Sequence, residues 1–177
     1  MATLLSLPGF DRHLCVVANR WGARRAVAVF FGAISRLGDG VFWYALMSVL
    51  AIFGGLHGAI AALQMLLTGA AALALYRLLK RWTRRPRPFR SCDGVIARVP
   101  PLDEFSFPSG HTLHAVSFTI VALGWFPLLA PLLVPFTALV AASRVVLGLH
   151  YPSDVIAAIG IGGMLGGISL SAASMIG

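Results

Sequence analysis

The sequence predicts an all-α integral membrane bundle of about five transmembrane helices, preceded by an amphipathic helix in the membrane interface. Of the 177 residues, 58% are hydrophobic and only 11% are charged, whereas about a quarter of a typical soluble domain is charged. Several apolar stretches approach the roughly 20 residues that a helix needs to cross a bilayer. A chain of this length suits one domain built around those helices.

The first thirty-seven residues predict a separate, amphipathic interfacial segment. Residues 8–37 mix apolar side chains with five arginines, and the longest uncharged run, residues 26–35, has only ten residues. We expect one or two helices in the interface, anchored by Trp21 and the arginines, with a tilted sixth span as the alternative. Charged residues at 11–13 interrupt any apolar signal-peptide core, so no cleaved signal is expected.

Residues 38–177 predict the transmembrane domain. Its expected spans are 41–55, 59–79, 109–126, 132–149 and 153–172. Small residues in the second and fifth of these favour close packing between helices in lipid. A polar loop, residues 80–108, separates the second span from the third, and its five prolines exclude a regular helix throughout. A loop of this length in a compact domain is usually functional or disordered.

The alternating direction of the spans places four polar clusters on one membrane face. Lys80 to Arg87 follows the second span, and Ser109 to His111 begins the third. Arg144 to His150 ends the fourth span, and Asp154 begins the fifth. Because ionisable groups at a membrane edge are costly, they are candidates for function by default.

These residue types suit phosphoryl transfer. Three cations and the free N–H groups at a helix N-terminus can neutralise phosphoryl oxygens. One imidazole can attack phosphorus while a second protonates the leaving oxygen. Asp154, four residues after His150, can accept a ring N–H and fix the tautomer. The candidate residues are Lys80, Arg87, Ser109, Gly110, His111, Arg144, His150 and Asp154.

Three blocks carry a family resemblance: Lys80 with Arg87-Pro88, then Pro108 to His111, then Ser143 to Asp154. Together they resemble the complete three-part signature of the type 2 phosphatidic acid phosphatase (PAP2) superfamily, with matching spacing inside every block.

The resemblance implies a helical bundle with lipid phosphatase activity. It implies that His150 is the nucleophile that becomes a phosphohistidine, that Asp154 holds it, and that His111 is the acid for the leaving group. It further implies that water hydrolyses the phosphoenzyme without a metal cofactor. The residues implied to bind the phosphoryl oxygens are Lys80, Arg87, Ser109, Gly110 and Arg144.

The implied substrates are membrane lipid phosphates, with undecaprenyl pyrophosphate first, then phosphatidylglycerol phosphate, phosphatidic acid or lipid A phosphates. The net charge of +8 lies beside apolar segments, which favours lipid head groups or a phosphorylated substrate over nucleic acid. Protein partners are not indicated. Two alternatives stay open: a phosphotransferase that passes the group to an alcohol, and an anion-binding transporter.

The resemblance also implies a multi-pass protein of the bacterial cytoplasmic (inner) membrane with a periplasmic active site. Counting positive charges would instead put the catalytic face in the cytoplasm, because most arginines lie there. We give this count less weight, since Lys80, Arg87 and Arg144 would be retained for phosphate. Cys15 and Cys92 lack metal-ligand spacing and could pair only in an oxidising compartment.

Four other polar residues are expected to have structural roles. His114, one helical turn after the first histidine of the signature, is expected to pack. Asp39 lies in a glycine turn and is expected to pair with a neighbouring arginine or face water. Asp103 is expected in a solvated part of the loop, with tuning of access or leaving-group binding as the alternative. Arg85 is expected to meet lipid head groups, substrate or solvent.

Overall fold

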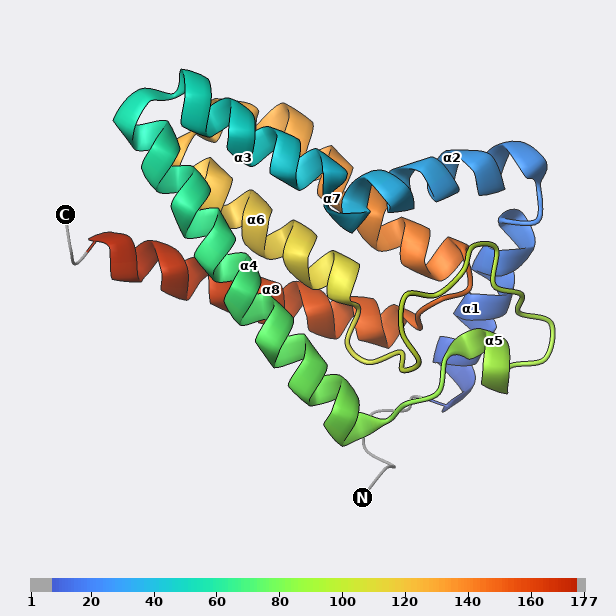
Figure 1. Cartoon of the computed structure of the whole chain (residues 1–177). Helices are drawn as coiled ribbons and strands as arrows, with labels where there is room; N and C mark the ends of the chain where they lie inside the picture. The colour runs from blue at the N-terminus through green and yellow to red at the C-terminus, as the bar shows by residue number, and fades with distance from the viewer. Residues whose placement is uncertain (1–7, 175–177) are drawn as a thin grey trace.

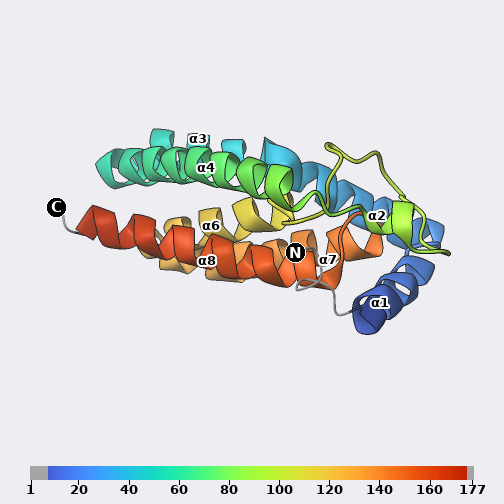
Figure 2. The same ribbon diagram turned by 90° about the horizontal axis from the view of Figure 1, so that it is seen from below.

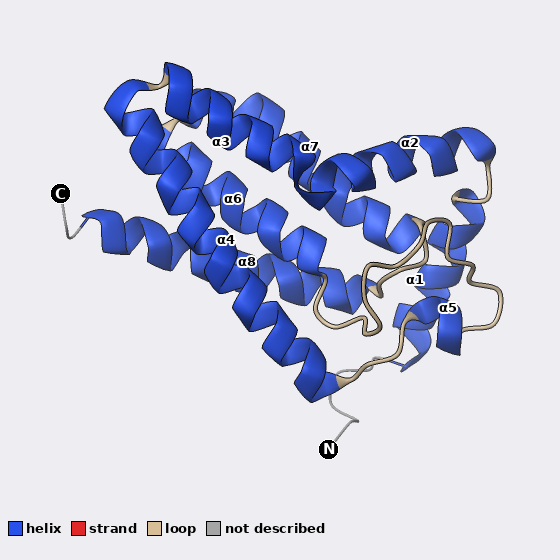
Figure 3. Cartoon of the chain, viewed as in Figure 1, coloured by secondary structure: helices blue, strands red, loops and turns tan. Residues whose placement is uncertain are grey.

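The computed structural model describes residues 8–174, and all regular elements within that range are helical (Figures 1 and 3). In chain order they are α1 (Pro8–Trp21), α2 (Arg25–Arg36), η1 (Leu37–Val41), α3 (Phe42–Phe53), α4 (Gly55–Thr83), α5 (Pro88–Ser91), α6 (Gly110–Trp125), η2 (Pro127–Leu129), α7 (Ala130–Val146) and α8 (Pro152–Ser174). The predicted all-α class is confirmed.

Helix α6 lies at the centre of the bundle and packs against α4, α7 and α8, while α3 packs against α4. Figure 2 shows α3 and α4 in one layer and α6, α7 and α8 in the other. Trp43, Met65, Phe118 and Phe136 meet between the layers as part of the largest buried apolar cluster. This core joins α3, α4, α6 and α7, so it fixes the helices whose ends carry the polar clusters.

Four helical segments are long and apolar enough to cross a membrane: Arg25–Phe53, Gly55–Ser91, Pro127–Val146 and Pro152–Ala173. Helix α6 has 16 residues and is shorter than these four. Large apolar side chains such as Ile52, Leu67, Leu128 and Ile156 are exposed on the outside of the bundle, where lipid would cover them. The chain is therefore a multi-pass membrane protein.

The first span is longer than the sequence predicted. Helix α2 leads through the kinked segment η1 into α3, so this candidate span crosses residue 37, where the interfacial segment was expected to end. Gly40 bends this path, because its φ of 134° lies outside the helical region. The bend coincides with the expected break at residues 38–40, where two helical segments meet at a kink.

Helix α1 packs across one end of the bundle, against α7 and α8. Its inner face buries Asp11, Cys15 and Asn19. The Asn19 amide donates to the carbonyl groups of Ile96 at 2.9 Å and Val146 at 3.1 Å. In return, the Asn19 side-chain oxygen accepts the Ile96 backbone N–H at 2.9 Å. Hydrogen bonds on both sides of the amide tie α1 to the loop and to the end of α7.

The polar loop begins later than expected. Helix α4 extends to Thr83 and ends at Arg84, which adopts a left-handed conformation with φ of 47°. Lys80 therefore lies on a helix and not in the loop predicted to start there. The backbone then forms α5 and an irregular segment before α6 begins at Gly110.

Candidate active site

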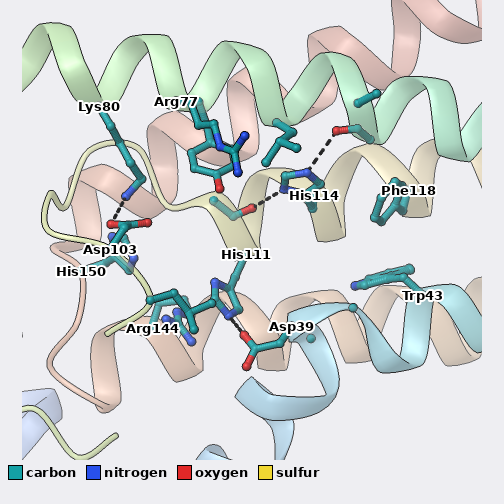
Figure 4. Close-up of a pocket in the computed structure, with 18 of the residues that line it drawn as sticks. Asp39, Trp43, Arg77, Lys80, Asp103, His111, His114, Phe118, Arg144 and His150 are labelled. Carbon is teal, nitrogen blue, oxygen red and sulfur yellow. Dashed lines mark hydrogen bonds and ion pairs between the residues drawn. The ribbon is translucent and has the colours of Figure 1, made fainter. Parts of the chain in front are cut away.

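The structure brings the predicted residues to the same end of the bundle. A cavity of about 690 Å³ is lined by six of them: Lys80, Arg87, Gly110, His111, Arg144 and His150. The other two, Ser109 and Asp154, are fully buried. Figure 4 shows Lys80 from α4, His111 from α6, Arg144 from α7 and His150 from the connection after α7 directed into this space. The ends of α4, α6 and α7 and the connections beside them thus supply one polar cavity.

His150 lies in the short connection between α7 and α8, and its side chain is only 2% exposed. Its Nδ1 faces the Asp154 carboxylate at 3.6 Å, and its Nε2 lies 3.3 Å from a guanidinium nitrogen of Arg87. Burial, reinforced by Arg144 and other nearby cations, holds the pKa of His150 well below its usual value of 6.5. The imidazole is therefore neutral near pH 7, with Nε2 beside the cations.

Asp154 is held from several sides. One carboxylate oxygen accepts the Tyr151 backbone N–H at 2.9 Å. The other accepts from the Arg85 guanidinium at 2.6 Å. The Ser109 backbone N–H donates to the Asp154 carbonyl at 3.3 Å, which joins the start of α6 to the start of α8. The Ser109 hydroxyl pairs with Thr112 at 2.9 Å, so both polar groups of Ser109 already have partners within the protein.

Arg85 lies at the site, although the sequence left lipid head groups, substrate and solvent open as its surroundings. Its guanidinium donates to Asp154 at 2.6 Å, to the Ser153 hydroxyl at 2.8 Å, and to Asp11 of α1 at 2.8 Å. It also lies 4.0 Å from the centre of the Tyr151 ring. Arg85 therefore connects the carboxylate behind His150 to the N-terminal helix.

Asp103 was expected in a solvated part of the loop, with a role in access or leaving-group binding as the alternative; its side chain is 37% exposed and also pairs with cations of the site. One oxygen of its carboxylate lies 2.9 Å from Lys80 Nζ and 2.7 Å from an Arg87 nitrogen. Burial alone would raise the pKa of Asp103, but Lys80 and Arg87 outweigh burial and hold this pKa below its usual value. An ionised carboxylate therefore bridges two of the three cations predicted to bind phosphate.

Two contacts come from the first span, where no site residue was predicted. The Arg144 guanidinium contacts the Ser35 hydroxyl of α2. The Asp39 carboxylate of η1 contacts Nε2 of His111, although Asp39 was expected to pair with an arginine or face water. Neither contact is visible in sequence, because the partners lie 109 and 72 positions apart.

His114 has the structural surroundings that its position predicted. Its Nδ1 lies 2.9 Å from the Gly110 carbonyl, and its Nε2 lies 3.2 Å from the Gly69 carbonyl of α4. Figure 4 shows the ring between α6 and α4. Both nitrogens are engaged with backbone oxygens, which suits a residue that joins two helices.

Cys15 and Cys92 are free thiols in one buried cluster with Val95 and Tyr151. Burial raises the pKa of Cys15 to about 12, so this thiol is protonated and unreactive near pH 7. Among the described residues 8–174, no three His, Cys, Asp or Glu side chains are grouped so that they could hold a metal ion. The donors that meet in the cavity are mostly cationic, which suits an anion.

Comparison with known proteins agrees with this geometry. Residues 61–176 match the family model described as the PAP2 superfamily. The chain is 36% identical over 128 residues to the decaprenylphosphoryl-5-phosphoribose phosphatase of Mycobacterium tuberculosis, which covers 68% of this chain and 67% of the relative. It is 34% identical over 121 residues to an undecaprenyl-diphosphatase of Bacillus subtilis, covering 65% of this chain and 59% of the relative.

Solved structures show the same fold. A PAP2 type phosphatidylglycerolphosphate phosphatase from Bacillus subtilis superposes with a TM-score of 0.76 at 24% identity, covering 94% of this chain and 86% of that one. LpxE from Aquifex aeolicus gives a TM-score of 0.76 at 27% identity, covering 90% and 93%. The family model spans more than half of the chain, and the relatives are lipid phosphatases. The protein thus belongs to the PAP2 superfamily and is a membrane-embedded hydrolase acting on phosphate esters.

Proposed function

We propose that the protein removes phosphate from a membrane lipid through a phosphohistidine at His150. In the first step, Nε2 of His150 attacks phosphorus, the bond from phosphorus to the leaving oxygen breaks, and His111 gives a proton to that oxygen. In the second step, water attacks the phosphohistidine, the P–N bond breaks, and His111 takes the proton from water. Asp154 orients the ring of His150 in both steps.

The cations hold the phosphoryl group in this proposal. Lys80, Arg87 and Arg144 neutralise its oxygens as charge develops. The Ser109 hydroxyl can accept from Thr112 and donate its own proton to the phosphoryl group, and with the Gly110 backbone N–H at the N-terminus of α6 it completes the anion site. The neutral state of His150 supports its role, since only an unprotonated nitrogen can attack phosphorus.

The shape of the cavity is the observation that supports a lipid substrate. Beyond the cations, its lining continues along apolar side chains of α3 and α4, among them Trp43, Met47, Leu66 and Leu73. A phosphate on a long apolar chain would place its head among the cations and its chain along this wall. We propose a polyprenyl phosphate or pyrophosphate such as undecaprenyl pyrophosphate as first candidate, because prenyl lipids are named for the relatives of Mycobacterium tuberculosis and Bacillus subtilis.

We also propose that the catalytic end faces the outside of the bacterial cytoplasmic membrane. Counting positive charges argues for the opposite side, but Lys80, Arg85 and Arg87 are paired with carboxylates of the site. Because these ion pairs and the proposed phosphate binding account for the three cations, their presence says little about which side of the membrane they face. A cysteine in place of Glu104, whose side chain is 67% exposed, should react with a membrane-impermeant maleimide in intact cells. Labelling only after permeabilisation would place this end in the cytoplasm.

The activity is tested by phosphate release from purified protein in detergent with a chelator present. The panel contains undecaprenyl pyrophosphate, phosphatidylglycerol phosphate, phosphatidic acid and lipid A phosphate. We expect release without any added alcohol acceptor, and loss of release in His150→Ala. His57→Ala is the matched control, because His57 is exposed, lies beside Trp125 and is not part of the cavity lining.

The intermediate is tested by brief reaction with substrate labelled in the transferred phosphate. Wild type and His57→Ala should retain an acid-labile, base-stable label, whereas His150→Ala should retain none. Phosphate release by His150→Ala at the wild-type rate would refute the phosphohistidine mechanism.

A further inference from the structure

Asp39 reaches the active site from a part of the chain that the PAP2 family model does not include. The model match begins at residue 61, whereas Asp39 lies in η1 between α2 and α3. Its carboxylate contacts Nε2 of His111, whose side chain is 11% exposed, and the Asp39 side chain is 34% exposed. Figure 4 shows Asp39 on the turn of the first span, directed at the His111 ring.

The turn that carries Asp39 is fixed by a glycine on each side. A Cβ on Gly38 would lie 3.0 Å from a methyl group of Val140, so α7 packs directly on this backbone. Gly40 has φ of 134°, a conformation that side-chain-bearing residues rarely adopt, and a Cβ there would lie 2.9 Å from the Tyr44 ring. This turn holds a carboxylate at one place on the cavity wall.

We propose that Asp39 is the positioning residue of His111 and fixes its ring so that Nδ1 faces the leaving oxygen. This inference rests on the proposed phosphatase mechanism and adds a residue to it. His111 enters the first step doubly protonated: Asp39 accepts its Nε2–H, and its Nδ1–H is the proton given to the leaving oxygen. In the second step, Nδ1 receives a proton from the attacking water, while Nε2–H stays on Asp39.

Charge in the cavity gives this arrangement a physical reason. The charged and titratable groups that face His111 are Arg144 of α7, His114 of α6, His150, and Asp39 itself. Nearby cations disfavour another positive charge, and a carboxylate in contact offsets them. Asp39 therefore has the same relation to the acid as Asp154 has to the nucleophile, with a carboxylate on the ring nitrogen that faces away from phosphorus.

The dependence on the leaving group tests the proposal. An alkoxide leaves poorly without a proton, whereas 4-nitrophenolate leaves readily without one. For a long-chain alkyl monophosphate, we expect Asp39→Asn to lower kcat/KM about 10-fold to 100-fold, the range of a weakened general acid. For 4-nitrophenyl phosphate, we expect a loss below about threefold, because that reaction needs little help from an acid. The ratio of the two values is measured on one preparation, so it is independent of the folded fraction.

Three further variants complete the test. Asp93→Asn is the matched control, because it removes the same charge from an exposed residue outside the cavity lining, and should leave the ratio unchanged. Asp39→Glu keeps a carboxylate and should recover part of the alkyl phosphate activity. His111→Ala should show the same selective loss, and adding Asp39→Asn to it should cause no further change, as for two residues acting as one unit.

An equal loss with both substrates in Asp39→Asn, or no loss with either, would overturn the role of Asp39. The proposed phosphatase mechanism would survive that result as long as His150→Ala remains inactive. Activity retained in His150→Ala would instead refute the proposed phosphatase mechanism, whatever Asp39→Asn shows.

Discussion

Removing the Arg85 side chain should destabilise the protein strongly. In Arg85→Ala, Asp154 and Asp11 lose their shared guanidinium, although their side chains are 0% and 5% exposed. Leaving a buried charge without its partner costs about 3–5 kcal/mol. For a protein of this size, that cost corresponds to a fall in Tm of roughly 10 °C. The freed Asp154 would also hold His150 less well, so kcat should fall about 10-fold to 100-fold, as for small displacements of catalytic groups.

The assay is thermal unfolding in detergent followed by intrinsic fluorescence, together with phosphate release below the melting temperature. Arg90→Ala is the control, because the ion pair of Arg90 with Glu104 is half-exposed or more on both sides, and such pairs contribute below about 1 kcal/mol. Arg85→Lys keeps one charge but cannot bridge both carboxylates, so its Tm should lie between those of wild type and Arg85→Ala. A Tm for Arg85→Ala equal to that of Arg90→Ala would refute the bridging role.

Two other predictions concern the cavity. The Asp103 carboxylate competes with an incoming anion for Lys80 and Arg87, and Asp103→Asn removes it. Inhibition by inorganic phosphate should therefore become about 10-fold stronger, a change of about 1.4 kcal/mol in binding free energy. An unchanged inhibition constant would show that Asp103 does not compete with the anion. Because the pKa of His150 is lowered, the folded protein keeps this ring neutral below pH 6.5, whereas the unfolded chain takes up a proton there. The free energy of unfolding should therefore fall as the pH drops below 6.5. Carbon NMR of ring-labelled histidine, assigned with His150→Gln, should show this ring titrating below 6.5, and a midpoint at or above 6.5 would show that burial does not depress it.

The helices and their common polar end could be predicted from sequence because both depend on local signals. Apolar length sets the spans, and the alternating direction of consecutive spans then requires Lys80, His111 and His150 to share one end. The start of α8 at Pro152 follows from the favourable place of proline in the first turn of a helix. The break at residues 38–40 follows from its two glycines, and the chain is kinked there at Gly40, whose backbone is not helical.

The carboxylates around the site could not be predicted in the same way. Asp11 and Asp39 meet their partners across 74 and 72 positions of sequence, and neither separation follows from helix periodicity. Asp103 looked like an ordinary loop residue because nothing in its neighbours indicates how the loop returns to Lys80. Local pattern therefore identifies the groups that react, while the residues that hold them in place depend on tertiary packing.

The docking of α1 has a consequence for how the enzyme is made. The buried carboxylate of this first helix is bound by Ser153, which lies 142 positions later in the chain. During synthesis, α1 can bind this partner only after the beginning of α8 has left the ribosome. We therefore expect the newly made chain to remain without activity through most of its insertion, and to align its nucleophile only when its two ends meet.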